Sequence, residues 1–97
     1  ILKNIWYNYT VWRNSMYTIY SKYGCPYCDK IKNIMQLTEQ KHVVYELGTD
    51  YTREEFYEEF GNGSTFPQVI LNAGADDSVK LGGCTDTVAY LKEQKVI

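Results

Sequence analysis

The sequence has 97 residues, a formal net charge of −2 at pH 7, and 44% apolar and 23% charged residues, as expected for one globular domain with a single core. Lys and Arg are scattered along the chain, so the basic footprint of a nucleic-acid-binding protein is missing. No apolar run approaches the roughly 20 residues that cross a bilayer, and we expect neither a membrane anchor nor a signal peptide.

The first fifteen residues fit the pattern of the rest of the chain least well. Their apolar side chains recur at helical spacing, whereas YTVW at 9–12 by itself is typical of a strand. We therefore divide the chain into an N-terminal extension, 1–15, and a main domain, 16–97. The extension is expected to cover apolar surface at a sheet edge or a subunit contact.

A strand and a helix are expected at the start of the main domain. Residues 16–21, MYTIYS, are rich in β-branched and aromatic side chains, which predicts a buried strand before a turn at Gly24. Pro26 suits the first position of a helix, and apolar residues follow at helical spacing as far as Thr38. The sequence therefore predicts that Cys25 caps a helix.

The remaining elements continue the alternation of strands and helices. A second strand is expected at 42–47, and Thr52 with Glu55 forms a capping box for a second helix. Two more strands and a last helix follow, at 66–72, at 78–83, and at 84–95 with Thr85 or Asp86 as its cap. The order β-α-β-α-β-β-α predicts an α/β fold, a four-stranded mixed sheet with helices on both faces.

Cys25 and Cys28 form a CxxC pair at the start of the predicted first helix. Unpaired backbone N–H groups and the helix dipole stabilise a thiolate there and lower its pKa from near 8.5 to about 3.5–7.5. Lys22 adds positive charge nearby. Cys25 would therefore attack a disulfide, and Cys28 would resolve the mixed disulfide that forms. Pro26 and Tyr27, between the cysteines, are expected to tune the reduction potential.

The CxxC spacing alone leaves other interpretations open. Zinc sites use the same spacing, and here Cys84 and His42 would have to supply the other ligands. A structural disulfide would close a loop so short that it gains little stability. We favour redox chemistry over both. Three cysteines, an odd number, fit a reducing compartment better than a paired disulfide framework, and we expect a cytoplasmic protein.

Three motifs in chain order carry a resemblance to a known family: YGCPYCDK at 23–30, STFPQV at 64–69 and LGGCTDT at 81–87. Together with the order of strands and helices, they resemble a dithiol glutaredoxin of the thioredoxin-like fold. The resemblance implies a glutathione-dependent thiol-disulfide oxidoreductase. Its implied partners are glutathione, as co-substrate, and disulfide-containing or glutathionylated proteins, and it implies no metal.

The resemblance also assigns roles to individual positions. Cys25 matches the family's nucleophile and Cys28 its resolving cysteine. The positions that match the glutathione-binding residues are Lys22, Tyr27, Phe66, Pro67, Gly83, Thr85 and Asp86.

Each of these positions would meet a different part of glutathione. Lys22 would meet a carboxylate, and the ring of Tyr27 would flank the tripeptide. The backbone of Phe66, before a cis-proline, would pair with the cysteinyl unit. The helix start near Asp86 would take the γ-glutamyl end.

Two features depart from the family pattern. Ser64 stands where many members carry arginine, so Arg53 or Gln68 would have to make the second contact to the glycyl carboxylate. The acidic hairpin at 72–80 is longer than is common. Cys84 lies beside the inferred site and is either an inert small residue or a thiol that is glutathionylated or oxidised.

Two alternative functions remain open from the sequence. One is a dedicated electron donor to an enzyme such as ribonucleotide reductase. The other is a binding module that holds an iron–sulfur cluster between two chains through Cys25 and two glutathiones. Family members of that kind usually carry a single active cysteine, and the CPYC sequence departs from that pattern.

Overall fold

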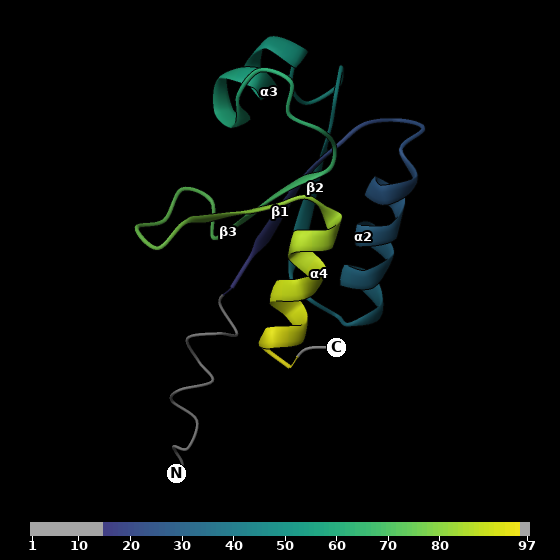
Figure 1. The fold of residues 1–97 in the computed structure, drawn as a ribbon, viewed down its shortest axis with the longest axis vertical. Coiled ribbons are helices and arrows are strands. Elements are labelled where there is room, and N and C mark those ends of the chain that lie inside the picture. Colours follow the sequence, from purple (N-terminus) through teal and green to yellow (C-terminus); the bar gives the residue numbers. More distant parts are fainter. Residues whose placement is uncertain (1–14, 96–97) are drawn as a thin grey trace.

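The computed structural model describes residues 15–95 (Figure 1). The predicted extension therefore lies, apart from Ser15, outside the described residues. The elements follow the predicted order: β1 (Tyr17–Ser21), α2 (Pro26–Leu37), β2 (His42–Glu46), α3 (Arg53–Phe60), β3 (Gln68–Leu71), β4 (Val79–Gly82) and α4 (Cys84–Glu93).

The four strands form one mixed sheet in the order β2-β1-β3-β4. β1 pairs in parallel with β2 and antiparallel with β3, so that Ile19 lies between Val44 and Val69. β3 and β4 form an antiparallel hairpin. The predicted four-stranded mixed sheet is confirmed, and its central strand, β1, leads directly to the cysteine pair.

Helices cover both faces of the sheet, with α2 and α4 together on one face and α3 on the other (Figure 1). The alternation of side chains in β1 explains this, because Tyr17 and Ile19 point to the α2 and α4 side while Tyr20 points to α3. The core on the α2 and α4 side consists of Tyr17, Ile19, Ile31, Met35, Val69, Leu71, Cys84 and Leu91.

An aromatic cluster forms the smaller core beneath α3. The ring of Phe56, which is 1% exposed, stacks on Phe66 at 4.1 Å between centroids and packs against Phe60 at 4.9 Å. Tyr20 and Tyr51 complete the cluster from the sheet side. Because Phe66 precedes Pro67, this core fixes the loop that faces the cysteines.

The first two predicted helix caps are confirmed. Cys25 is the N-cap of α2 and Pro26 follows at the first helical position. Thr52 and Glu55 form the capping box of α3, in which the Glu55 N–H donates to the Thr52 hydroxyl at 3.1 Å and the Thr52 N–H donates to the Glu55 carboxylate at 2.8 Å.

The predicted cap of α4 is wrong. The N-cap is Gly83, and neither Thr85 nor Asp86 caps the helix, since no side chain makes a cap hydrogen bond there. The Gly83 carbonyl already accepts the N–H of Thr87 at 2.9 Å and its hydroxyl at 2.8 Å, so the helix begins earlier than expected. Asp86 lies within the first turn.

The last two strands are shorter than predicted. β3 begins at Gln68, because Pro67 has no N–H to donate to the ladder. β4 ends at Gly82, whose φ of 105° takes the chain out of the strand and into α4.

Candidate active site

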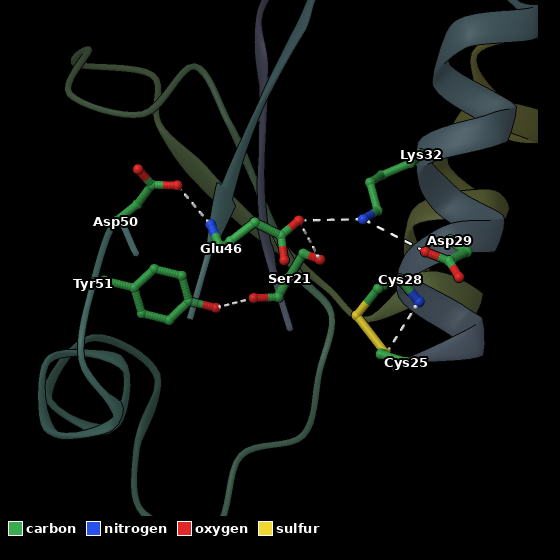
Figure 2. Close-up of polar contacts among 8 residues, drawn as sticks. All are labelled: Ser21, Cys25, Cys28, Asp29, Lys32, Glu46, Asp50 and Tyr51. Atoms are coloured by element: carbon green, nitrogen blue, oxygen red, sulfur yellow. Dashed lines mark hydrogen bonds and ion pairs between the residues drawn. A yellow bond between two sulfur atoms is a disulfide. The ribbon is translucent and has the colours of Figure 1, made fainter. Parts of the chain in front are cut away.

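The cysteine pair lies at the start of α2, where the two residues are joined in a disulfide with their Cα atoms 5.2 Å apart (Figure 2). The Cys25 sulfur accepts the backbone N–H of Cys28 at 3.2 Å. Cys25 is 6% exposed and Cys28 is completely buried. Cys25 is therefore the more exposed of the two cysteines, and its sulfur is also the one that receives a hydrogen bond from the helix start.

The loop before β3 faces this disulfide. The Cys25 sulfur lies 3.9 Å from the carbonyl oxygen of Phe66, and the Phe66–Pro67 peptide bond is cis, as the resemblance implies. A Cβ atom placed on Gly83 would lie 3.5 Å from the carbonyl oxygen of Pro67. The buried Pro67 thus lies between the cysteine pair and the start of α4.

Two cations flank the ring of Phe66. The Lys22 ammonium lies 5.3 Å from the ring centroid and the Arg53 guanidinium carbon lies 5.9 Å from it. Gln68, the other candidate for a second carboxylate contact, donates its side-chain amide to the Thr65 carbonyl at 2.9 Å. The structure therefore brings Arg53 to the same place as Lys22, where together they can attract an anionic group.

The start of α4 presents its first backbone N–H groups next to Asp86. A Cβ atom on Gly82 would come within 2.5 Å of a carboxylate oxygen of Asp86, which would have to move, and the φ of 105° at Gly82 itself favours glycine. Thr85 and Asp86 are both exposed. This end of α4 can thus hold a carboxylate on its N–H groups and an amine on Asp86.

Two cavities lie on different sides of α2. One, of about 250 Å³, brings Tyr27 and Thr85 together over Cys84. The other, of about 510 Å³, is lined by Lys22 and by charged residues of α2 and β2. Tyr27 and Thr85 therefore line one of these two cavities and Lys22 the other.

The third cysteine is buried beside this region. Cys84 is a free thiol, 6% exposed, in the first turn of α4. Burial raises the pKa of this thiol, and the positive charge of Lys30 opposes that shift without cancelling it. The geometry agrees with the interpretation of Cys84 as an unreactive small residue.

A polar network beside the cysteine pair was not predicted from the sequence. Lys32 of α2 pairs with Glu46 at 3.2 Å and with Asp29 at 3.5 Å, and the Ser21 hydroxyl donates to Glu46 at 3.1 Å (Figure 2). The sequence feature that pointed to this network was Ser21, a residue with a hydroxyl group at the end of the first predicted strand, which was expected to be buried. Its charged partner depends on the register that sets Ser21 opposite Glu46.

Within residues 15–95 the structure shows no group of three or more His, Cys, Asp or Glu side chains that could hold a metal ion. The ring of His42, which the zinc interpretation required, has Nδ1 2.7 Å from the Gln40 carbonyl. In the same part of the chain, no helix is both long and apolar enough to cross a membrane.

A mixed four-stranded sheet, with a CxxC disulfide at a helix start opposite a cis-proline, defines a thiol-disulfide oxidoreductase of the thioredoxin-like fold. The family model described as glutaredoxin matches residues 17–73. Glutaredoxin 1 of Rickettsia prowazekii is 32% identical over 83 residues, which cover 80% of this chain and 79% of that protein. The chain belongs to the glutaredoxin family.

Solved structures agree with the fold. Glutaredoxin from Brucella melitensis superposes with a TM-score of 0.62 at 31% identity, covering 82% of each chain. Glutaredoxin 1 from Francisella tularensis superposes with a TM-score of 0.66 at 23% identity, covering 84% of this chain and 96% of that one.

Proposed function

We propose that the protein is a glutathione-dependent oxidoreductase that reduces protein disulfides with both cysteines and glutathione mixed disulfides with Cys25 alone. The observation that carries the proposal is the N–H of Cys28 donated to the Cys25 sulfur at the N-cap of α2. A backbone N–H and the helix dipole stabilise negative charge on that sulfur. Such chemistry needs reduced thiols, which supports a cytoplasmic location.

The reaction proceeds by two exchanges between sulfur atoms. The Cys25 thiolate attacks one sulfur of the substrate disulfide, and the other substrate sulfur leaves as a thiolate that takes a proton from water. With a protein disulfide, the Cys28 thiolate then attacks the Cys25 sulfur, forms the Cys25–Cys28 disulfide and releases the second substrate thiol. With a glutathione mixed disulfide, Cys25 is left joined to glutathione, and a second glutathione thiolate attacks that glutathione sulfur, so that glutathione disulfide forms and the Cys25 thiolate leaves. Two electrons pass to the substrate, from the Cys25–Cys28 pair or from glutathione, and glutathione restores the dithiol.

The surroundings of the disulfide support glutathione as the reductant. Lys22 and Arg53, beside the Phe66 ring, provide positive charge for one carboxylate. The start of α4 provides N–H groups for the other, and Asp86 provides a negative charge for the amine. Tyr27, 61% exposed, lines a cavity together with Thr85 at the start of α4. We propose that the backbone of Phe66 pairs with the cysteinyl unit.

Replacing each cysteine tests this proposal. Cys25→Ser is expected to reduce both reactions to the uncatalysed rate, because it removes the attacking sulfur. Cys28→Ser is expected to remove protein-disulfide reduction and leave deglutathionylation largely intact. Both rates are measured with NADPH and glutathione reductase as the source of electrons, on a small protein disulfide and on a glutathionylated peptide.

The matched control is Cys84→Ala, which removes a buried thiol outside the pair and should leave both rates unchanged. Equal loss of deglutathionylation in Cys25→Ser and Cys28→Ser would contradict the assigned roles. Activity that thioredoxin reductase supports and glutathione does not would contradict the glutathione dependence.

A further inference from the structure

The Lys32–Glu46 pair connects the helix that begins at the cysteine pair to the edge strand β2 of the sheet (Figure 2). Glu46 is the last residue of β2, and the oxygen that pairs with Lys32 also accepts the hydroxyl of Ser21, the last residue of β1. The Lys32 side chain is 28% exposed and that of Glu46 is 36% exposed. Both charges are thus partly shielded from water.

The sheet side of this connection is firmly held. Ser21 is completely buried, and its carbonyl accepts the hydroxyl of Tyr51 at 2.5 Å. The backbone N–H of Glu46 donates to the carboxylate of Asp50 at 2.8 Å. The carboxylate that Lys32 meets therefore projects from a fixed position.

The placement of the pair matters for the loop that leads to the active site. Ser21 ends β1, and three residues, 22–24, separate it from Cys25. Lys32 lies four residues after Cys28, one turn further along the same side of α2. The contact between Lys32 and Glu46 thus holds the middle of α2 to β2 and, through the Ser21 hydroxyl, to the end of β1, from which the loop departs.

We infer that Lys32 and Glu46 are positioning residues that keep the two cysteine sulfurs within reach of each other. The inference rests on the proposed roles of Cys25 and Cys28. In the resolving step, the Cys28 thiolate forms a bond to the Cys25 sulfur while the bond from Cys25 to the substrate sulfur breaks. That step depends on the effective concentration of one sulfur at the other, and small displacements of the helix lower it.

A direct effect of charge on Cys28 would give a different result. If the Lys32 ammonium acted through its field, its removal would disfavour the Cys28 thiolate, whereas removal of the Glu46 carboxylate would favour it. The two changes would then shift the dithiol–disulfide equilibrium in opposite directions. A positioning role predicts that both changes weaken the disulfide relative to the dithiol.

The test is the equilibrium between dithiol and disulfide in glutathione redox buffers, in which glutathione acts only as a reagent that poises the pair. We expect Lys32→Gln and Glu46→Gln each to favour the dithiol about threefold, the scale of one partly exposed ion pair, or ~14 mV toward less negative potential. The reversed pair, K32E with E46K, should restore the equilibrium. The reversal is made in Asp29→Asn, because Asp29 also contacts Lys32.

The matched control is Glu59→Gln, which breaks the Lys80–Glu59 pair of 3.3 Å outside this network and should leave the potential unchanged. Opposite shifts, absent shifts, or a reversal without recovery would overturn the inference. Deglutathionylation, measured in the Cys28→Ser background, should be equal with and without Glu46→Gln. If wild-type protein showed no deglutathionylation, the proposed function would be contradicted. The equilibrium between dithiol and disulfide would still decide the role of the Lys32–Glu46 pair.

Discussion

Tyr51 shows how a single polar group can be held inside this small protein. Its side chain is 8% exposed, and its hydroxyl donates to the Ser21 carbonyl at the end of β1. Burial, followed by the negative charge of Glu46, raises the pKa of the phenol above its ordinary value of 10.0. The folded protein therefore favours the neutral phenol.

This shift predicts how stability changes in alkaline solution. Below pH 10 the contribution of Tyr51 is fully present, and it is lost as the pH rises toward the raised pKa, because the unfolded chain ionises first. Tyr51→Phe should lower the free energy of unfolding by about 1 kcal/mol at pH 7, by loss of the hydrogen bond. It should also lose less stability than wild type between pH 10 and pH 11.

Urea unfolding of the oxidised protein, followed by circular dichroism, measures both effects. Tyr23→Phe is the control, since Tyr23 is 98% exposed and should change neither value. If the Tyr51→Phe protein lost as much stability between pH 10 and pH 11 as wild type does, Tyr51 would not be responsible for that loss.

At the scale of elements, the junction of β4 and α4 combines a glycine with positive φ at the end of the strand, a helix start without a side-chain cap, and an exposed acid in the first turn, Asp86. We expect Asp86→Ala to raise the KM for glutathione more than it lowers kcat, because the contact to the amine forms in the bound state and persists during the reaction. Steady-state kinetics with varied glutathione measures the split.

Asp76→Ala is the control for Asp86, because it removes an exposed acid from the hairpin between β3 and β4. Its KM should equal that of wild type. An unchanged KM in Asp86→Ala would remove this residue from the glutathione site.

The elements also show where sequence reasoning succeeds and where it stops. The start of α2 could be predicted because Pro26 and the apolar spacing act locally, and these signals also predicted Cys25 as the cap. The start of α4 was misjudged, since Thr85 and Asp86 are good capping residues, whereas Gly83 was selected by the turn out of β4. At this position the turn out of β4, and not the capping preference of the side chains, sets where the helix begins.

Contacts between distant residues were the least predictable part of the site. The pairing of Lys32 with Glu46 joins residues that are 14 apart in sequence and depends on the register between β1 and β2. Likewise, no local signal places Arg53 of α3 at the Phe66 ring near Lys22. The motifs could predict which residues take part, but the arrangement of charges required the packing of α2 and α3.

For the whole molecule, the sheet separates two cores of different character. Mostly aliphatic side chains, with Tyr17, Met35 and Cys84, fill the α2 and α4 side, and aromatic rings fill the α3 side. Leu91, completely buried, anchors α4 against the first core. Leu91→Ala should lower the free energy of unfolding by about 2–5 kcal/mol, because it leaves a cavity in a closely packed region.

Urea unfolding compares this variant with Leu37→Ala, which removes the same atoms from a side chain that is 83% exposed. The control should change stability by less than about 0.5 kcal/mol. Similar losses in both variants would show that burial in the core does not govern stability at these positions.

The burial of Cys84 also affects the molecule as a whole. Three cysteine thiols in one small chain could form a disulfide in three ways, and each disulfide would have its own equilibrium with the surrounding thiols. Burial raises the pKa of the Cys84 thiol, so a smaller share of it is thiolate at neutral pH and it is a poorer nucleophile than an ordinary exposed cysteine. The Cys25–Cys28 disulfide is therefore the favoured intramolecular disulfide of the chain, and one dithiol–disulfide couple dominates its exchange with surrounding thiols.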